Sequence, residues 1–349
     1  MNAKSGAVED VHDLDADRLF GWMTANVAGF AGPMTYVKFA GGQSNPTYRI
    51  DAASGRYVLR RKPFGPLLPS AHAVDREFRL ISALHPTGFP VARPYGLCED
   101  DDVLGSAFYV MEMVDGVTHW DGSLPGHTPA QRTAIYNEIA DRLAELHAVD
   151  YQAAGLGEFG KPGSYFERQV GRWTKQYRLA QTDDVPEAEK LIEWLPRTLP
   201  EQRRTAIVHG DYRIDNMIFA KGEPRVKAVL DWELATLGDP MADLAYILIN
   251  WEMPANGAAS IGGVAGGDSG IPTMEAMAAR YCERAGVDSI PDLNWYFAFG
   301  QFRLLGIVQG IKKRALDGNA SNTQAKEMAE RIPMLAESAW AFAQKAGAA

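Results

Sequence analysis

The sequence predicts an α+β chain in which a small antiparallel sheet precedes a larger helical part. Residues 35–114 alternate short apolar runs with glycine and proline turns, a pattern typical of strands. From about Thr128 onward, apolar residues recur at helical spacing. The 349 residues also exceed the roughly 250–300 that a single hydrophobic core accommodates. We therefore expect two lobes, covering residues 1–114 and 115–349.

The composition is that of a globular protein and excludes several function classes. Apolar residues make up 46% of the chain and charged residues 23%, and the net charge is −9. This negative charge argues against a nucleic-acid or anionic-membrane partner. Two cysteines, Cys98 and Cys282, cannot build a disulfide framework. With neither a secretion signal nor a long apolar run, the sequence predicts a cytoplasmic protein.

Three strands are expected early in the chain, after a disordered stretch at 1–12 and a capped helix. They cover residues 35–39, 47–51 and 57–60. The turn Gly41-Gly42-Gln43-Ser44-Asn45 joins the first two strands, and its glycines let the backbone approach a ligand and expose N–H groups. The alternative is a plain hairpin turn without a ligand. Without evidence from the rest of the chain, the glycines favour this alternative.

Two charged residues of this region are candidates for phosphate binding. Strand alternation places Arg60 on the same face as Val58, and a helix follows over residues 72–84. Glu77 lies beside the buried stripe of that helix, from where it can reach a basic partner such as Arg60. A solvated arginine at a strand end and a solvated helix glutamate are the alternatives.

A nearly continuous apolar run over 107–113 predicts a strand that is covered on both faces. The acidic residues Glu99–Asp102, which precede it, predict a solvated turn. Asp115 and Gly116 end the run, and we place the lobe boundary there.

The helical part is expected to contain one strongly amphipathic helix through Ile135 and Leu146. His147 follows its apolar stripe and is interpreted as a packing or capping residue. The Gly-rich segment 261–270 could be a lid or a loose linker. Further helices are expected over 164–180, 186–195, 273–285, 291–316 and 323–345, and the aromatic residues of the first two are more often core than substrate platforms.

The candidate chemistry is concentrated in His209–Phe219 and the following Val229–Glu233. A strand leaves the first stretch and a second strand returns, so the pair is antiparallel and its open ends lie side by side. Asn216 and Asp231 are therefore expected near each other, with Asp211 just upstream. Amide and carboxylate oxygens suit Mg²⁺, and one acid remains as a base. Asx turns and helix caps are the alternative use of such residues.

Residues 233–240 are expected to form a loop, and a helix follows over 241–249. Asp243 lies among apolar neighbours in that helix. A buried carboxylate needs hydrogen-bond donors. Backbone N–H groups of the loop or of His209–Asp211 could provide them.

Taken together, these motifs resemble the aminoglycoside phosphotransferase family, which has a two-lobed, protein-kinase-like fold. The resemblance rests on His209-Gly210-Asp211…Asn216, Asp231 and Asp243, and on the strand that ends in Met111-Glu112-Met113-Val114. It covers about residues 30–345. The strings Tyr212–Asn216 and Leu230–Pro240 are most similar to the phosphotransferase-like domains associated with acyl-CoA dehydrogenases.

The resemblance implies roles for the helical-lobe residues. Asp211 resembles the catalytic base that accepts the proton of the substrate hydroxyl. Asn216 and Asp231 resemble the Mg²⁺ ligands that bridge the ATP phosphates, so catalysis is expected to be mainly positioning and charge neutralisation. Asp243 resembles the acid that steadies the catalytic loop.

For the first lobe, the resemblance implies a nucleotide site. Glu77 resembles the glutamate that orients the phosphate-binding base. The backbone of Glu112 and Val114 would face the adenine from the hinge. Gly41, Gly42 and Ser44 would contact phosphates, although the full kinase glycine motif is missing.

Two further residues differ from the usual pattern. Arg60 stands where kinases usually carry lysine; it keeps the charge, but its guanidinium is larger and has a different geometry. The contact could also shift to Arg61 or Lys62. Asp215 adds a carboxylate before Asn216, and an ion pair with Arg213 is expected for it.

The leading hypothesis is an ATP- and Mg²⁺-dependent kinase of a small-molecule hydroxyl. The resemblance suggests a hydroxyacyl compound or its CoA thioester as the acceptor, and a functional link to an acyl-CoA dehydrogenase. A protein acceptor is disfavoured, because no activation segment is recognisable between Asp231 and Asp243. A nucleotide-binding pseudokinase or interaction module, an aminoglycoside kinase and a metal-dependent hydrolase are the alternatives.

Overall fold

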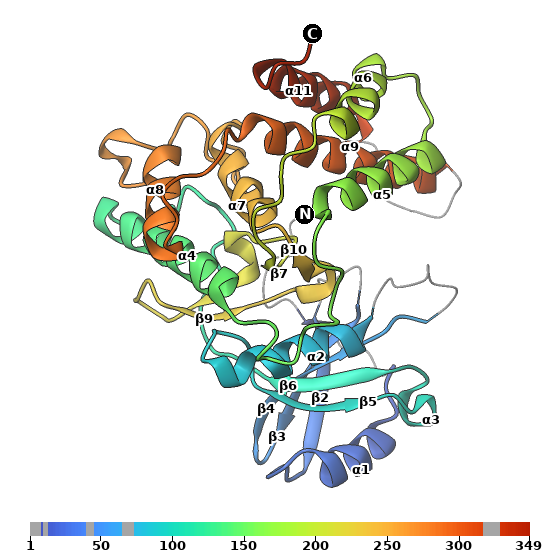
Figure 1. Cartoon of the computed structure of the whole chain (residues 1–349). Coiled ribbons are helices and arrows are strands. Elements are labelled where there is room, and N and C mark those ends of the chain that lie inside the picture. Colours follow the sequence, from blue (N-terminus) through green and yellow to red (C-terminus); the bar gives the residue numbers. More distant parts are fainter. Residues whose placement is uncertain (1–7, 10–12, 40–44, 65–72, 317–328) are drawn as a thin grey trace.

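The structure, a computed structural model, describes residues 8–9, 13–39, 45–64, 73–316 and 329–349. Figure 1 shows a strand-rich end and a helical end, one above the other. Among the described residues, no helix is both long enough and apolar enough to cross a membrane.

The strand-rich end is built on a six-stranded antiparallel sheet with the order β1-β2-β3-β4-β6-β5. The predicted strands are present. Residues 1–12 were expected to be disordered, but Val8–Glu9 pairs with Lys38 and Phe39 as an edge strand. The strands are β1 (Val8–Glu9), β2 (Met34–Phe39), β3 (Thr47–Ala52), β4 (Gly55–Arg61), β5 (Pro94–Cys98) and β6 (Phe108–Glu112).

Helix α1 (Ala16–Asn26) covers one face of this sheet (Figure 1). It begins where the Asp15 side chain accepts a hydrogen bond from Arg18 N, which satisfies one of the free N–H groups of the first turn. Leu19 and Met23 lie four residues apart and are fully buried in a core that includes Leu59.

The other face of the sheet carries helix α2 (Val74–Leu84), which also packs against the helical end. Its buried residues Leu80 and Leu84 belong to one continuous core that extends into the helices. Phe108, Tyr109 and Val110 of β6 are buried, so the prediction of a strand covered on both faces is confirmed for these residues, whereas Met111 is half-buried and Glu112 is exposed. The acidic turn is instead a short helix, α3 (Asp101–Leu104), because Asp100 caps its first turn.

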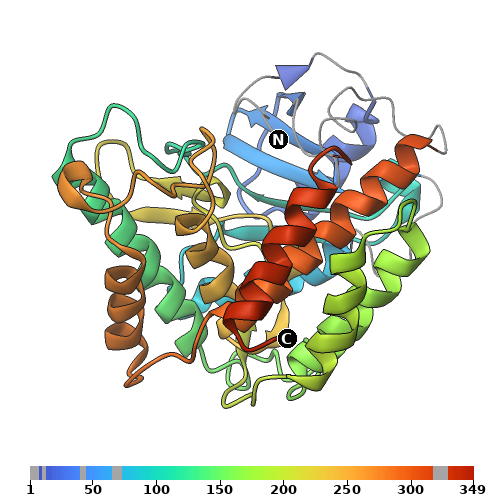
Figure 2. The same ribbon diagram turned by 90° about the horizontal axis from the view of Figure 1, so that it is seen from above.

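The helical end is arranged in two groups. In Figure 2, α4 and α8 lie side by side on one side of the molecule, while α9 and α11 pack against α5 and α6 on the other. Helix α9 buries aromatic residues on several sides, as expected. The helices are α4 (Pro129–Ala148), α5 (Tyr165–Ala180), α6 (Pro186–Trp194), α7 (Met241–Leu248), α8 (Met274–Ala285), α9 (Asn294–Leu316) and α11 (Ile332–Lys345).

Two short two-stranded ladders lie between the strand-rich end and the helices of the other end. Strands β8 (Met217–Phe219) and β9 (Val226–Val229) form the predicted antiparallel pair. Strand β7 (Ala206–Val208) pairs with β10 (Thr236–Gly238), although residues 233–240 were expected to form a loop. A three-residue strand shows no clear alternation, and its partner is distant in sequence, so its own sequence did not reveal it.

The Gly-rich segment 261–270 is fixed to its surroundings. Ile261 is fully buried, and its N–H donates to Asn250 O at 2.8 Å. At the other end of the segment, Arg132 of α4 donates to Ser269 O at 3.0 Å. These contacts hold one end of the segment to Asn250 and the other end to α4.

Candidate active site

The loop between β7 and β8 presents the carboxylate of Asp211. The Tyr246 hydroxyl donates to Asp211 Oδ1 at 2.6 Å, and the Asn216 amide donates to Oδ2 at 2.9 Å. Gly210 makes the sharp turn before it with φ +82°, and a Cβ there would lie 2.9 Å from Leu234 O. The carboxylate is therefore held from two sides.

Asp243 fixes the backbone of the same loop. It is fully buried, and its two oxygens accept hydrogen bonds from His209 N at 2.6 Å and Gly210 N at 2.8 Å. The expected donors are confirmed. Burial raises the pKa of Asp243, but the hydrogen bonds from His147 and His209 outweigh this effect and leave the pKa below its usual value.

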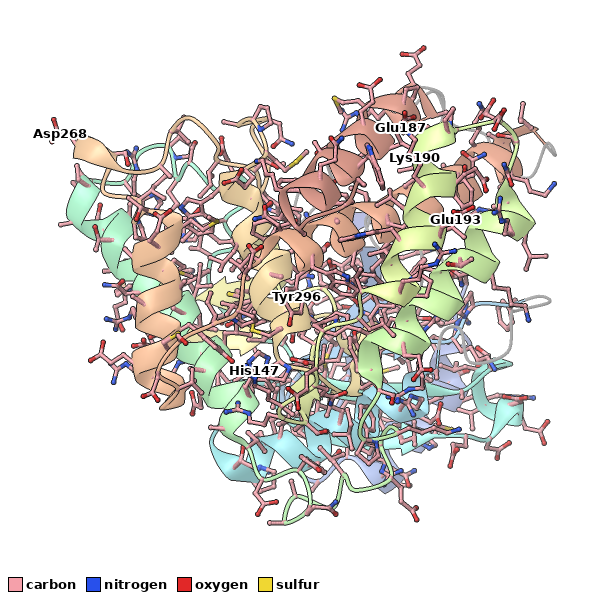
Figure 3. The ribbon with its side chains drawn as sticks, turned by 45° about the horizontal axis from the view of Figure 1, so that its top comes forward. His147, Glu187, Lys190, Glu193, Asp268 and Tyr296 are labelled. Atoms are coloured by element: carbon pink, nitrogen blue, oxygen red, sulfur yellow. The ribbon has the colours of Figure 1, made fainter. Side chains whose placement is uncertain are left out.

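His147 supports Asp243 from the end of α4 (Figure 3). Its Nε2 lies 3.4 Å from Asp243 Oδ2, and its Nδ1 lies 2.8 Å from the Tyr281 hydroxyl. Because it is fully buried among these partners, it packs and orients, as the sequence suggested. Through Tyr281 and Asp243, it links α4 and α8 to the loop that carries Asp211.

Asn216 and Asp231 stand at the adjacent ends of the β8–β9 ladder, as predicted. Leu230 N donates to Asn216 O at 2.8 Å, which fixes their proximity. The Asn216 amide nitrogen bonds the Asp211 backbone and side chain, so the amide oxygen points away from Asp211. Asp231 has φ +67°, a left-handed conformation that costs a non-glycine residue about 1–3 kcal/mol and is often found at functional sites.

Arg60 reaches its predicted partner Glu77 and also contacts Asp231, the predicted metal ligand. Its guanidinium lies 3.0 Å from Glu77 Oε2 and 2.8 Å from Asp231 Oδ1, and Glu233 is 3.5 Å away. Arg61, by contrast, is buried on the opposite side of the strand, where it lies over the ring of Tyr48. Arg60 is therefore the basic residue of this strand that faces the acids.

Glu77 is buried and fully engaged. Its Oε1 accepts from Asn45 Nδ2 at 3.0 Å and its Oε2 from the Tyr109 hydroxyl at 3.0 Å. Burial raises the pKa of Glu77 to about 7, against the opposing effects of Arg60 and Tyr109. Through Asn45, this carboxylate also anchors the last residue of the Gly-rich turn. The predicted contact residues Gly41, Gly42 and Ser44 themselves lie outside the described residues.

The end of β6 lies beside a small apolar cluster. Val114 is buried there with Ala92 and Ala228, and Met111, Ile218 and Leu230 pack against them. The backbone N–H of Glu112 already donates to Arg93 O at 2.8 Å. Of the Glu112 backbone groups, only the carbonyl could therefore contact a ligand.

Sequence reasoning missed two residues at this site. Tyr246 looked like one more apolar position of α7, although its spacing of three from Asp243 places both on one helix face. Arg303 of α9 donates to Gly210 O at 2.8 Å and lies over the Tyr246 ring. The available signal was that Arg303 is the one charged residue between Trp295 and Val308, among largely apolar positions where a charge is uncommon.

The predicted ion pair of Arg213 with Asp215 is confirmed, with Arg213 Nε 2.9 Å from Asp215 Oδ1. The carboxylate of Asp215 is therefore engaged by Arg213. Within the described ranges, no group of three or more His, Cys, Asp or Glu residues is placed to hold a metal ion. Mg²⁺ usually takes one or two protein ligands and completes its shell with water and phosphate oxygens. The side-chain oxygens of Asn216 and Asp231 could therefore supply the one or two protein ligands that a Mg²⁺ ion needs.

A groove of about 830 Å³ lies elsewhere, between α8, the start of α9 and the end of α11. It is lined by acidic residues such as Glu275 and Asp288, together with Lys345. None of the predicted site residues contributes to it.

Comparison with known proteins identifies relatives along most of the chain. The sequence profile of the family described as "Phosphotransferase enzyme family" (APH) matches residues 35–280. Mouse acyl-CoA dehydrogenase family member 10 is 48% identical over 319 residues, which are 90% of this chain and 30% of the relative. Human acyl-CoA dehydrogenase family member 11 is 40% identical over 332 residues, 93% of this chain and 43% of the relative. The chain thus spans less than half the length of these relatives.

Solved structures show the same fold. A protein of Ralstonia eutropha JMP134, named after the aminoglycoside phosphotransferases, is 47% identical, with a TM-score of 0.87 over 95% of this chain and 99% of its own. Spectinomycin phosphotransferase, solved with ADP and spectinomycin, has a TM-score of 0.59 at 13% identity, over 95% of this chain and 99% of its own. The predicted two-lobed, protein-kinase-like fold is confirmed.

Proposed function

Because the chain belongs to the phosphotransferase enzyme family, we propose that it transfers the γ-phosphoryl group of ATP to a hydroxyl of a small-molecule acceptor. The observation that carries this proposal is the placement of Asp211. Its carboxylate is held by Tyr246 and Asn216, at the open end of the ladder that carries Asn216 and Asp231. The ADP found in a structure of the same fold supports ATP as the donor.

Asp211 acts as the base in this scheme. It accepts the proton of the acceptor hydroxyl while that oxygen forms a bond to the γ-phosphorus. The bond from the γ-phosphorus to the β–γ bridging oxygen breaks, and ADP leaves with that oxygen. The protein contributes mainly orientation and charge stabilisation, as is general for phosphoryl transfer.

The remaining residues of the proposed site would bind the metal ion and the phosphates. Asn216 and Asp231 would hold Mg²⁺, which neutralises phosphate charge when bound. Arg60 would contact the phosphates, and Glu77 orients its guanidinium across a 3.0 Å contact. The N–H groups of the turn with Gly41, Gly42 and Ser44 would complete the phosphate site.

The adenine would bind at the end of β6. The Glu112 carbonyl and the Val114 N–H are its hydrogen-bonding groups, and the apolar cluster around Val114 offers a surface for the ring. In this scheme, residues 1–114 are the nucleotide-binding lobe and 115–349 the lobe for catalysis and acceptor binding.

A hydroxyacyl compound, free or as its CoA thioester, is the proposed acceptor. The support is the 40–48% identity to proteins named as acyl-CoA dehydrogenase family members, which also suggests a functional link to such a dehydrogenase. An aminoglycoside is the alternative acceptor, because the 47% identical Ralstonia protein is named after the aminoglycoside phosphotransferases. The unpaired cysteines Cys98 and Cys282 agree with the proposed cytoplasmic location. The joint presence of Asp211, Asn216 and Asp231 favours an active enzyme over a nucleotide-binding module.

The test is a transfer assay with labelled ATP and Mg²⁺ against hydroxyacyl-CoAs, hydroxy acids and aminoglycosides. We expect label in a hydroxyacyl acceptor. Asp211→Asn keeps the size of the side chain, so it should leave ATP binding nearly intact while transfer falls by about 10²–10⁴-fold. Full activity in Asp211→Asn would show that the base is assigned wrongly. Binding of ATP and Mg²⁺ without transfer to any acceptor would favour the binding module.

A further inference from the structure

We propose that Arg303 and Trp173 form an acceptor subsite that binds an acyl oxygen, either a carboxylate or a thioester carbonyl, and selects acyl compounds over polycationic amines. This inference deepens the proposed function and rests on it for the place of the reacting hydroxyl. The subsite lies between α5, which carries Trp173, and α9, which carries Arg303. These helices pack together (Figure 2).

Arg303 places a positive charge next to the proposed base. Its Nη2 donates to Gly210 O at 2.8 Å, one residue before Asp211, and its guanidinium lies 5.4 Å from the ring centroid of Tyr246. Tyr246 in turn bonds Asp211. A group bound by Arg303 would therefore lie close to the hydroxyl that Asp211 deprotonates.

Arg303 forms no ion pair with an acid in the described part of the chain. Arg60 and Arg213 make ion pairs with carboxylates, whereas Arg303 makes none with any acid of the described residues. Within the described part of the chain, its one hydrogen bond is to the neutral carbonyl of Gly210, and its aromatic contacts are with the rings of Trp173 and Tyr246. A half-buried cation without a counter-charge attracts an anion or a strongly polar oxygen.

Trp173 adds a buried donor that has no hydrogen-bond partner among the described residues. Its side chain is 7% exposed, and its indole N–H is buried with no hydrogen bond among the described residues. Its ring centroid lies 5.5 Å from the guanidinium carbon of Arg303, and Arg172 lies 5.7 Å away on α5. A buried donor without an acceptor is costly, and a ligand oxygen would satisfy it.

These features define the chemistry of the ligand. An N–H donor and a guanidinium suit a carboxylate or carbonyl oxygen, both of which accept hydrogen bonds. The same positive charge, with Arg172 nearby, opposes the binding of a polycation such as an aminoglycoside. The subsite thus fits an acceptor in which the hydroxyl and the acyl oxygen are only a few bonds apart.

The test compares matched acceptors. Straight-chain 3-hydroxy acids of increasing length, their coenzyme A thioesters, the matching secondary alcohols and kanamycin are assayed for transfer from ATP, and their binding is measured by calorimetry in the presence of ADP. We expect transfer to acyl acceptors and neither transfer nor binding with kanamycin. The free acids and the thioesters separate the two possible sources of the acyl oxygen.

Trp173→Phe removes the N–H and keeps an aromatic ring. It should raise the KM and Kd for acyl acceptors about tenfold, the effect of one strong hydrogen bond, without changing the KM for ATP. Trp340→Phe, which alters a tryptophan of α11 that lies beside Lys190, is the control and should behave as wild type. Arg303→Lys should retain the acyl preference, whereas Arg303→Gln should lose it.

Three results would overturn the subsite. The first is equal use of alcohols, kanamycin and acyl compounds by the wild type. The second is a Trp173→Phe variant that binds acyl compounds normally or loses ATP and acceptor affinity alike. The third is failure of the wild type to bind any acyl compound. Acyl binding that is weakened by Trp173→Phe, with no transfer to any acceptor, would instead support the subsite and contradict phosphotransfer.

Discussion

The hydroxyl of Tyr246 lies 2.6 Å from Oδ1 of Asp211, so helix α7 directly positions the proposed catalytic base. Burial raises the pKa of this tyrosine, as does the neighbouring Asp211, and the phenol therefore remains a donor. The carboxylate oxygen that it holds cannot rotate freely. The same helix face carries Asp243, so α7 fixes both the backbone and the side chain of the catalytic loop.

Tyr246→Phe should lower kcat about tenfold, because the base loses the donor that orients it while the ring packing is kept. The KM for ATP should stay near its wild-type value. Steady-state kinetics with the best acceptor will measure both. Tyr136→Phe removes a buried hydroxyl that bonds Gly122 O elsewhere, and is the matched control. Equal losses in the two variants would argue against a role of Tyr246 in positioning.

Asp243→Ala should destabilise the protein and also lower kcat. It leaves two buried backbone N–H groups, of His209 and Gly210, without acceptors, at a cost of about 1–3 kcal/mol each. Urea unfolding will report the loss of stability. Assays well below the unfolding transition will report kcat, which falls because the loop that carries Asp211 is no longer held. Unchanged stability would contradict the burial and bonding described here.

Asp231→Ala should abolish Mg²⁺-dependent nucleotide binding, since it removes one of the two proposed oxygen ligands. Calorimetry with ATP, with and without Mg²⁺, will measure this loss. The control is Asp268→Ala, at an exposed position near the edge of the molecule in Figure 3, which should bind as wild type. Retention of the Mg²⁺ effect in Asp231→Ala would exclude this residue as a ligand.

Asp239→Asn should remove part of the pH dependence of stability. Burial raises the pKa of Asp239 from 3.8 to about 6, although Met241 N donates to its Oδ1 at 2.9 Å. The folded state therefore prefers the protonated acid, and its stability should fall as pH rises from 3.8 to about 6. At neutral pH the loss approaches about 3 kcal/mol, at 1.36 kcal/mol per pKa unit.

Asparagine does not titrate and can still accept the bond from Met241. The variant should therefore gain stability relative to wild type as pH rises through that window. Urea unfolding of both proteins across the window will measure the difference. A constant difference at all pH values would show that Asp239 titrates normally.

The sequence predicted much of this architecture because local patterns specify it. The helix through Ile135 and Leu146 has one apolar stripe and a Thr128 cap, and it lies where periodicity places it. The proximity of Asn216 to Asp231 followed from the geometry of a short hairpin. The donors for Asp243 followed from the rule that a buried carboxylate must be hydrogen-bonded.

The remaining site residues depend on contacts that periodicity does not encode. Tyr246 and Arg303 lie in helices whose patterns describe only their burial, and their partners are 35 and 93 residues away in the chain. The pairing of β7 with β10 was also not predictable, because a strand of three residues is too short to show the alternation of apolar and polar residues. Tertiary packing brings these residues together.

The ladder of β7 and β10 has a consequence for control of the enzyme. In many protein kinases, the segment after the metal-binding aspartate is a long loop that becomes ordered on phosphorylation. Here Thr236–Gly238 is already paired with Val208, Ile207 and Ala206, five residues after Asp231. No length of chain is left there to switch between an ordered and a disordered state. The segment that follows the proposed metal ligand Asp231 is thus ordered by its own strand pairing, without a covalent modification.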